Sequence, residues 1–249
     1  MSEIKVNPEG KVVFVSGSNR GIGWAMVIEL LESGAKKVYA GARDTETLHQ
    51  LKERFGDRLI PVTLDVTDQD SINQAATLTG DVEILVNNAG ILAPGGFIGE
   101  SAIDSLHNHF KVNVIGLINL TNAFIDQLKS SSVGAIVNIS SVAGLANMPL
   151  IGTYSASKAT VHSITQSLRG ELAQEHILVA GVYPGPIDTD MAKGFDMEKD
   201  SPENVAKNVV QGLIQGVEDI FPDEMSEQVA QQYRNSPKSL EETFATYVA

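Results

Sequence analysis

Apolar residues recur along this chain in two alternating patterns. Short runs that are apolar at most positions and rich in β-branched residues occupy 12–15, 37–40, 59–64, 82–86, 135–139, 178–183 and 218–221. Segments with the period of a helix occupy 22–33, 45–54, 69–78, 104–129, 154–174, 202–215 and 226–246, the last with an expected break near Pro237. Strands without polar alternation are typical of a parallel sheet that helices cover on both faces.

The repeated order of strand and helix predicts an α/β fold, a Rossmann-type doubly wound parallel sheet of about seven strands with helices on both faces. No linker, internal repeat or low-complexity tract interrupts the pattern, so we expect a single domain over residues 1–249 that ends in a helical tail from about residue 222. The most irregular stretches, 91–103 and 184–201, follow strands, where such folds bind ligands. We therefore expect these two loops to shape a substrate pocket.

Composition narrows the class of protein. The 249 residues are 43% hydrophobic, and no run approaches the roughly 18 consecutive apolar residues of a membrane helix. The first residues, MSEIKVNPEGK, lack the apolar segment of a secretory signal, so we expect a soluble, cytoplasmic protein. Cysteine is absent, which excludes disulfides and thiol chemistry.

Charge narrows the choice of partner. The chain holds 18 Lys and Arg against 31 Asp and Glu, a formal net charge of −13. This excess of negative charge disfavours nucleic acid, anionic membranes and acidic carrier proteins as partners. We therefore expect a small-molecule substrate.

A glycine-rich loop follows the first predicted strand. The segment SGSNRGIG places Gly17, Gly21 and Gly23 directly before the apolar helix WAMVIELL. Glycines permit a tight turn and a close approach of the backbone to a phosphate, and the N-terminus of the following helix favours an anion. Because strand, loop and helix come in the required order, the segment predicts a dinucleotide site.

The end of the second predicted strand bears on which dinucleotide binds. In an NAD site an acidic side chain about 20 residues further on binds the ribose hydroxyls, but VYAGARD has Ala42 at the expected place. Arg43 and Arg20 could both approach a 2′-phosphate, which favours NADP(H) over NAD(H). Asp44 could still be the ribose ligand in another register, so NAD(H) stays possible.

Tyr154 and Lys158 stand four residues apart in TYSASKAT, on a predicted helix. Residues at this spacing share one helix face, so the phenol and the ammonium should project toward the same region. A nearby ammonium favours the phenolate, so we expect Lys158 to lower the pKa of Tyr154 from its usual value of about 10. A phenol tuned in this way is suited to proton exchange near neutral pH.

Further motifs stand in a fixed order along nearly the whole chain. Together with the glycine loop they are SGSNRGIG, LDVTD, LVNNAGI, KVNVIG, IVNISSVAG, YSASK and PGPIDTDM. With these motifs the chain resembles the short-chain dehydrogenase/reductase family, in particular its carbonyl reductase-like members. The resemblance implies hydride transfer between a nicotinamide cofactor and a carbonyl compound or alcohol.

The resemblance also assigns residues. It implies a catalytic tetrad of Asn113, Ser141, Tyr154 and Lys158, with Ser141 chosen over Ser140 because the family's serine lies 13 residues before its tyrosine. The implied cofactor-binding residues are Gly17, Ser18, Asn19, Arg20, Gly21, Ile22, Gly23, Arg43, Asp65, Val66, Asn88, Ala89, Gly90, Tyr154, Lys158, Pro184, Gly185, Ile187 and Thr189.

The chemistry explains why these residue types belong together. As hydride reaches a carbonyl carbon, negative charge builds on the carbonyl oxygen, which must be stabilised and then protonated. Ser141 can donate a hydrogen bond to that oxygen while Tyr154 delivers the proton. The resemblance adds that Lys158 holds the nicotinamide ribose and that Asn113 positions a water in a proton relay.

The histidines do not point to a metal. His107 and His109 lie two residues apart and would diverge on a helix, and no carboxylate completes a set with metal-binding spacing, so we assign no metal. His162, one helical turn beyond Lys158, is expected to be a packing residue rather than a second base.

The substrate is defined only by class. The loops ILAPGGFIGE, VAGLANMPLIGT and MAKGFDMEKD hold several apolar side chains and no cations except Lys193 and Lys199. We expect a small or medium, largely apolar aldehyde or ketone, or the corresponding alcohol. An NAD-linked alcohol or steroid dehydrogenase stays open, as does a catalytically inactive NADP-sensing regulatory protein, although the intact tetrad argues against the sensor.

The resemblance implies a homo-oligomer formed through the long helices near 104–129 and 154–174. The chain lacks the glycine-rich ending that is common in the family, so a dimer and a tetramer both stay open. An amphipathic helix is expected around Met225 to Tyr233, and the tail could cap the pocket or a neighbouring subunit.

Overall fold

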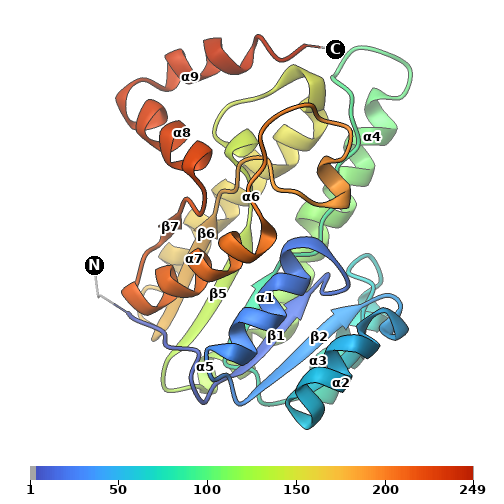
Figure 1. Cartoon of the computed structure of the whole chain (residues 1–249), viewed down its shortest axis with the longest axis vertical. Helices are drawn as coiled ribbons and strands as arrows, with labels where there is room; N and C mark the ends of the chain where they lie inside the picture. The colour runs from blue at the N-terminus through green and yellow to red at the C-terminus, as the bar shows by residue number, and fades with distance from the viewer. Residues whose placement is uncertain (1–3, 249) are drawn as a thin grey trace.

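The computed structural model describes residues 4–248, and its strands and helices alternate as the apolar pattern predicts (Figure 1). The strands are β1 (Val12–Ser16), β2 (Lys37–Ala42), β3 (Leu59–Thr63), β4 (Ile84–Asn87), β5 (Gly134–Ile139), β6 (Ile177–Val182) and β7 (Asp219–Ile220). The helices are α1 (Gly21–Glu32), α2 (His49–Phe55), α3 (Gln69–Thr79), α4 (Ala102–His109), α5 (Gly116–Ser130), α6 (Gly152–Glu171), α7 (Pro202–Gln215), α8 (Glu224–Asn235) and α9 (Pro237–Phe244).

Within the described chain one sheet joins seven parallel strands in the order β3-β2-β1-β4-β5-β6-β7. The order of strands reverses between β1 and β4, and doubly wound folds bind ligands in the crevice at such a point. The predicted Rossmann-type sheet is thereby confirmed. Among the described helices, none combines the length and the apolar character that crossing a bilayer requires.

Helices cover both faces of the sheet. One core layer packs α1, α2 and α7 against Val13 and Val15 of β1, and the other packs α3, α5 and α6 against Val12 and Phe14. Because successive residues of a strand point to opposite faces, a strand between two helical layers is buried on both faces and is apolar at most positions. This burial on both faces is the physical reason for the apolar runs.

The helix predicted over 104–129 is one helical run whose pitch changes in the middle. α4 ends at His109, a π-helical segment spans Phe110–Ile115, and α5 begins at Gly116. A Cβ atom at Gly116 would lie 2.9 Å from the carbonyl oxygen of Val66, so glycine lets this helix approach the loop after β3 closely. π-helical turns are frequent at functional sites, and this one contains Asn113.

The C-terminal tail forms two helices, with the break where Pro237 predicts it. α8 follows Asp223, whose buried carboxylate accepts a hydrogen bond from the Ser226 backbone at 2.9 Å, and α9 begins at Pro237. Figure 1 shows α8 and α9 beyond the two helical layers, at the same end of the molecule as α4. Leu240 and Phe244 of α9 are buried there in a third apolar cluster.

Candidate active site

A cavity of about 440 Å³ opens where the strands end. Its walls come from the segments that follow β1 to β6, from Tyr154 and Lys158 of α6, and from Tyr247 of the tail. The predicted site residues that line it are Gly17, Asn19, Arg20, Gly21, Ile22, Gly23, Arg43, Asp65, Val66, Asn88, Ala89, Gly90, Ser141, Tyr154, Lys158, Pro184, Gly185, Ile187 and Thr189. The fold thus brings together residues that are up to 172 positions apart in the sequence, Gly17 and Thr189.

Ser18, which was predicted to bind the cofactor, does not belong to this lining. Its side chain is fully buried, and its hydroxyl donates to the carbonyl oxygen of Val15 at 2.7 Å. The hydroxyl is therefore used to close the turn after β1 from the inside. Sequence position alone could not show this, because neighbouring residues in a tight turn point in different directions.

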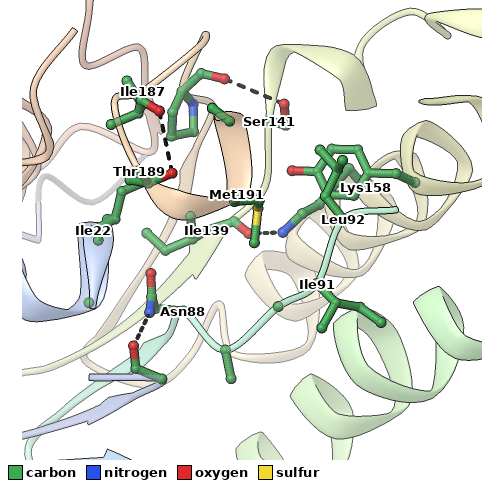
Figure 2. Close-up of a pocket in the computed structure, with 18 of the residues that line it drawn as sticks. Ile22, Asn88, Ile91, Leu92, Ile139, Ser141, Lys158, Ile187, Thr189 and Met191 are labelled. Atoms are coloured by element: carbon green, nitrogen blue, oxygen red, sulfur yellow. Dashed lines mark hydrogen bonds between the residues drawn. The ribbon is translucent and has the colours of Figure 1, made fainter. Parts of the chain in front are cut away.

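The glycine loop fits a dinucleotide. Gly17 and Gly21 adopt positive φ angles of 66° and 55°, and a Cβ atom at Gly23 would lie 2.2 Å from the carbonyl oxygen of Gly17. α1 begins without a side-chain cap and with no acidic residue in its first turn, so its free backbone N–H groups favour an anion. Asn88 holds the loop in place, because its side-chain amide donates to the carbonyl oxygens of Ser16 and Gly17, at 2.9 and 3.0 Å. Figure 2 shows one of these bonds.

Two arginines line the cavity at the end that the glycine loop and the segment after β2 form, called the cofactor end below. Arg20 and Arg43 both line it, and Arg20 also reaches across to Asp190, with 3.6 Å between the charged atoms. Asp44 lies outside the lining, and its carboxylate accepts a hydrogen bond from the backbone of Glu46 at 3.0 Å. The carboxylate that could have bound a ribose is therefore used to cap the short helical turn that follows β2.

Asp65, predicted to bind the cofactor, is held ionised in the loop after β3. Its carboxylate accepts hydrogen bonds from the backbone and the hydroxyl of Thr67, both at 2.8 Å. These two bonds lower the pKa of Asp65, and the charge of Arg43 lowers it further. The side chain is thus an acceptor that is fixed in position beside the cavity.

Ser141, Tyr154 and Lys158 meet in the middle of the cavity. The Lys158 ammonium donates to the carbonyl oxygen of Ile139 at 2.7 Å and lies 5.7 Å from the centre of the Tyr154 ring. The Ser141 hydroxyl accepts from the backbone of Ala143 at 3.1 Å and donates weakly to the carbonyl oxygen of Pro184 at 3.4 Å. Figure 2 shows the bonds that Ser141 and Lys158 donate to these carbonyl oxygens.

The acidity of this pair differs from the prediction. Burial raises the pKa of Tyr154 to about 12, although the Ser141 hydroxyl lowers it in part, and burial lowers the pKa of Lys158 to about 8. The expected lowering of the phenol pKa by Lys158 is therefore wrong for the protein without cofactor. The physical reason is that both side chains are more than nine-tenths buried, so the loss of solvent around each charge outweighs their mutual attraction.

Asn113 is buried beside the cavity and does not line it. Its side-chain oxygen accepts from the backbone of Ile91 at 2.8 Å, and its amide donates to the Ile91 carbonyl and to the Ser157 hydroxyl, both at 3.0 Å. All of these bonds join the π-helical segment to the loop after β4 and to α6. Asn113 thus holds the backbone of the loop that borders the cavity.

The other end of the cavity is apolar. Its lining includes Leu92, Met148, Leu150, Ile151, Met191, Phe195, Met197 and Tyr247. Most of these residues come from the two loops predicted to shape the pocket and from the segment after β5. Tyr247 was not predicted individually: the backbone of Leu150 donates to its carbonyl oxygen at 2.9 Å, a contact between segments almost a hundred residues apart.

His162 lies away from the cavity. Its Nδ1 atom is 2.7 Å from the hydroxyl oxygen of Tyr183, and its Nε2 atom is 3.1 Å from the side-chain amide of Gln166. Its ring packs edge-on against Tyr183, as expected of a packing residue. Over residues 4–248, no three His, Asp or Glu side chains come together as metal ligands would.

Known proteins are similar to this chain in sequence. The family model for short chain dehydrogenases matches residues 11–200, which include β1 to β6 and every predicted catalytic residue. An uncharacterised oxidoreductase of Staphylococcus saprophyticus is 32% identical over 213 residues, which cover 81% of this chain and 90% of that protein. The short chain dehydrogenase pigC of Monascus ruber is 30% identical over 205 residues, 78% of this chain and 68% of that protein.

A solved structure is also similar over nearly its whole length. A short chain dehydrogenase from Burkholderia cenocepacia, solved in complex with NADP, is 32% identical with a TM-score of 0.90, and the match covers 96% of this chain and 99% of that one. The sequence matches and the similarity of the fold agree. This chain therefore belongs to the short-chain dehydrogenase family.

Proposed function

We propose that this protein transfers a hydride between NADP(H) and a small or medium, largely apolar aldehyde or ketone, or the corresponding alcohol. One observation carries the proposal: a single cavity has Arg20 and Arg43 at one end, the buried Tyr154 and Lys158 in its middle and an apolar wall at the other end. Among the described lining residues, no lysine or arginine lies in the apolar wall. A neutral substrate fits such a wall better than a carboxylate or a phosphate.

The preference for NADP(H) is supported by the cations at the cofactor end. Arg20 and Arg43 can form charge-assisted hydrogen bonds to a 2′-phosphate, whereas the Asp44 carboxylate points to its own backbone turn. The Burkholderia cenocepacia relative was solved with NADP. An NAD-linked alcohol or steroid dehydrogenase is the alternative, and a comparison of NADPH with NADH decides between them.

The proposed chemistry uses three side chains. The bound cofactor supplies the hydride. Ser141 donates a hydrogen bond to the carbonyl oxygen of the substrate, and the Tyr154 hydroxyl gives that oxygen a proton as its negative charge develops. In the reverse direction, the Tyr154 oxygen takes the proton from the alcohol.

Lys158 and Asn113 support the proton transfer. The Lys158 ammonium, 5.7 Å from the Tyr154 ring, favours the phenolate that remains once the proton has left. Burial alone makes that phenolate unfavourable, so in this proposal the positive charge of Lys158 and of an oxidised nicotinamide must act together. Asn113, in the π-helical segment, holds the loop backbone at Ile91. In this proposal it also positions the water of the proton relay.

We also propose a cytoplasmic homo-oligomer. Ile115 and Ile118 lie on the helical run that ends in α5, and their side chains are 51% and 37% exposed. Large apolar residues at this exposure are suited to a contact with a second copy. Sedimentation of the purified protein would distinguish a monomer, a dimer and a tetramer.

The function is tested by screening neutral aldehydes and ketones while NADPH absorbance is followed, with Tyr154→Phe as the matched control. Phenylalanine keeps the ring and removes the proton, so we expect turnover to fall by about 10²- to 10⁴-fold, with the Kd for NADPH changed by less than about twofold. Undiminished reduction by this variant would exclude Tyr154 as the proton donor. A wild-type protein that binds NADPH but reduces no carbonyl compound would favour the regulatory protein.

A further inference from the structure

His109 is a buried ionisable side chain that the proposed reaction leaves unexplained. It ends α4 directly before the π-helical segment, and only 1% of its surface is exposed. It neither lines the cavity nor belongs to a metal site, yet its ring packs edge-on against the Tyr154 ring, with 5.9 Å between the ring centres. A histidine at this depth needs a partner for each ring nitrogen.

Both ring nitrogens have such partners, and these define the tautomer. The backbone N–H of Ala93 donates to Nε2 at 3.0 Å, and Nδ1 lies 3.1 Å from the hydroxyl oxygen of Thr153. A backbone N–H can only donate, so Nε2 must be the acceptor and carries no proton. In the neutral ring the proton is therefore on Nδ1, which donates to Thr153, the residue that directly precedes Tyr154.

His109 and Asn113 act on the same loop. They stand four residues apart on one helical run, so they share a face. Asn113 bonds the N–H and the carbonyl of Ile91, and His109 bonds the N–H of Ala93 two residues further along. Leu92, between these two attachment points, lines the apolar end of the cavity.

We propose that His109, as the neutral Nδ1–H tautomer, is a positioning residue that fixes the Tyr154 ring and the loop at Leu92. This inference rests on the proposed function, since it concerns the placement of the proton donor relative to the substrate wall. His109 itself touches neither the cofactor nor the reacting atoms. Protonation of the ring would place a second N–H at Nε2, facing the N–H of Ala93, so the attachment of the loop would be lost in acid.

The surroundings of His109 support the neutral ring. Burial lowers its pKa, and the positive charge of Lys158 lowers it further, while a hydrogen bond with the Ser105 backbone raises it. The titratable groups that face it from α6 are Tyr154 and Lys158, and the loop residues 91–95 are ILAPG, none of which titrates. Since the folded pKa is lowered, the positioning should be complete above about pH 6.5 and be lost as pH falls through the folded value.

The tautomer can be observed without measuring activity. In histidine-labelled protein at pH 7, the ¹⁵N and ¹H signals of His109 can be identified by their loss in His109→Gln. We expect a protonated Nδ1 and an unprotonated Nε2. A proton on Nε2, alone or in a charged ring, would overturn the proposal whether or not the enzyme reduces any carbonyl compound.

Kinetics test the positioning itself. In His109→Gln the side-chain oxygen can accept from Ala93 in place of Nε2, so kcat should stay within about threefold of the wild type and the acid loss due to His109 should disappear. His109→Leu keeps bulk but removes both bonds, so kcat should fall by about 10- to 100-fold with an unchanged Kd for NADPH. Full activity of His109→Leu, or equal losses in both variants, would overturn the proposal.

Thr153→Val provides a second test should His109→Leu fail to fold. Valine matches the shape of threonine and removes the hydroxyl that accepts the Nδ1 proton and that also lies 3.0 Å from the Ser105 hydroxyl, so a loss in kcat of about three- to tenfold is expected. An undiminished kcat would overturn the proposal. A wild-type protein that reduces no carbonyl compound would refute the proposed function, and the NMR measurement would still decide the role of His109.

Discussion

The two ends of the cavity are built in different ways. The cofactor end is made of short motifs that directly follow β1 to β4. The apolar end is made of side chains from distant segments, among them Leu92, Met148, Phe195 and Tyr247. Local chain geometry therefore determines the first end, whereas the packing of distant segments determines the second. We expect changes at the cofactor end to abolish binding and changes at the apolar end to alter selectivity.

The largest effect is expected from Gly23→Ala at the cofactor end. The added Cβ would lie 2.2 Å from the carbonyl oxygen of Gly17 and 2.4 Å from the Asn88 amide, so the loop must move. We expect the Kd for NADPH to rise by about 100-fold or more, measured by fluorescence titration. Gly170→Ala is the matched control, because a Cβ there meets nothing within 4 Å and alanine should favour α6. Equal NADPH affinity of the two variants would contradict the backbone role of the loop.

Arg43→Ala should have the next largest effect and should distinguish the two cofactors. Loss of a charge-assisted bond to the 2′-phosphate should raise the Kd for NADPH by about 10- to 100-fold and leave that for NADH within about twofold. Arg54→Ala is the control, since Arg54 pairs with Glu32 on the exposed surface. An equal effect on both cofactors would mean that Arg43 does not contact the phosphate.

Lys158 lies where the two ends of the cavity meet. We expect Lys158→Met to raise the free energy of unfolding at pH 7 by about 1–2 kcal/mol. Burial lowers the pKa of Lys158 from 10.5 to about 8, so the unfolded chain binds more protons between these values and wild-type stability rises with pH across this window. At pH 7 the cofactor-free variant should therefore be more stable than the wild type, although inactive, and the difference should shrink between pH 8 and 10.5.

Urea unfolding at several pH values measures this difference. The sign of this difference shows whether burying the ammonium costs more free energy than its hydrogen bond returns. A variant that is less stable than the wild type at pH 7 would show that the bond from Lys158 to the Ile139 carbonyl outweighs the cost of burying the ammonium.

The smallest effect is expected at the apolar end, from Tyr247→Leu. A smaller side chain should widen the wall, so kcat/KM for bulky ketones should improve by about fivefold relative to small ones, with NADPH affinity unchanged. Tyr233→Leu is the control, because Tyr233 packs in the same apolar cluster but does not line the cavity. The same shift in selectivity in both variants would mean that the tail acts only through stability.

The fold could be predicted because its rule is local. Strands between two helical layers are apolar at most positions, so β1 and β5 were recognisable from their residues alone. The break at Pro237 was predictable for the same reason, since proline is suited to the first turn of a helix and not to its interior. The change of pitch at Phe110–Ile115 was not predictable, because the surrounding apolar pattern continues through it.

The site could be predicted in part. Tyr154 and Asp65, which stand in motifs that the resemblance supplied, both line the cavity. Ser18 lies outside the lining of the cavity, and only the turn geometry shows that its hydroxyl points to Val15. The contacts of His109 with Ala93 and Thr153 left no recognisable pattern, since the second of them joins residues 44 positions apart.

By itself the sequence determined the doubly wound parallel sheet and the glycine loop that follows its first strand, because each depends on residues close together in the chain. Tertiary structure alone decided how deeply Tyr154 and Lys158 are buried, and hence that burial raises the pKa of the phenol instead of lowering it. It also decided that Tyr247 closes the apolar wall. Solvation and shape complementarity are set by all the segments that surround a group, and these come together only when the chain folds.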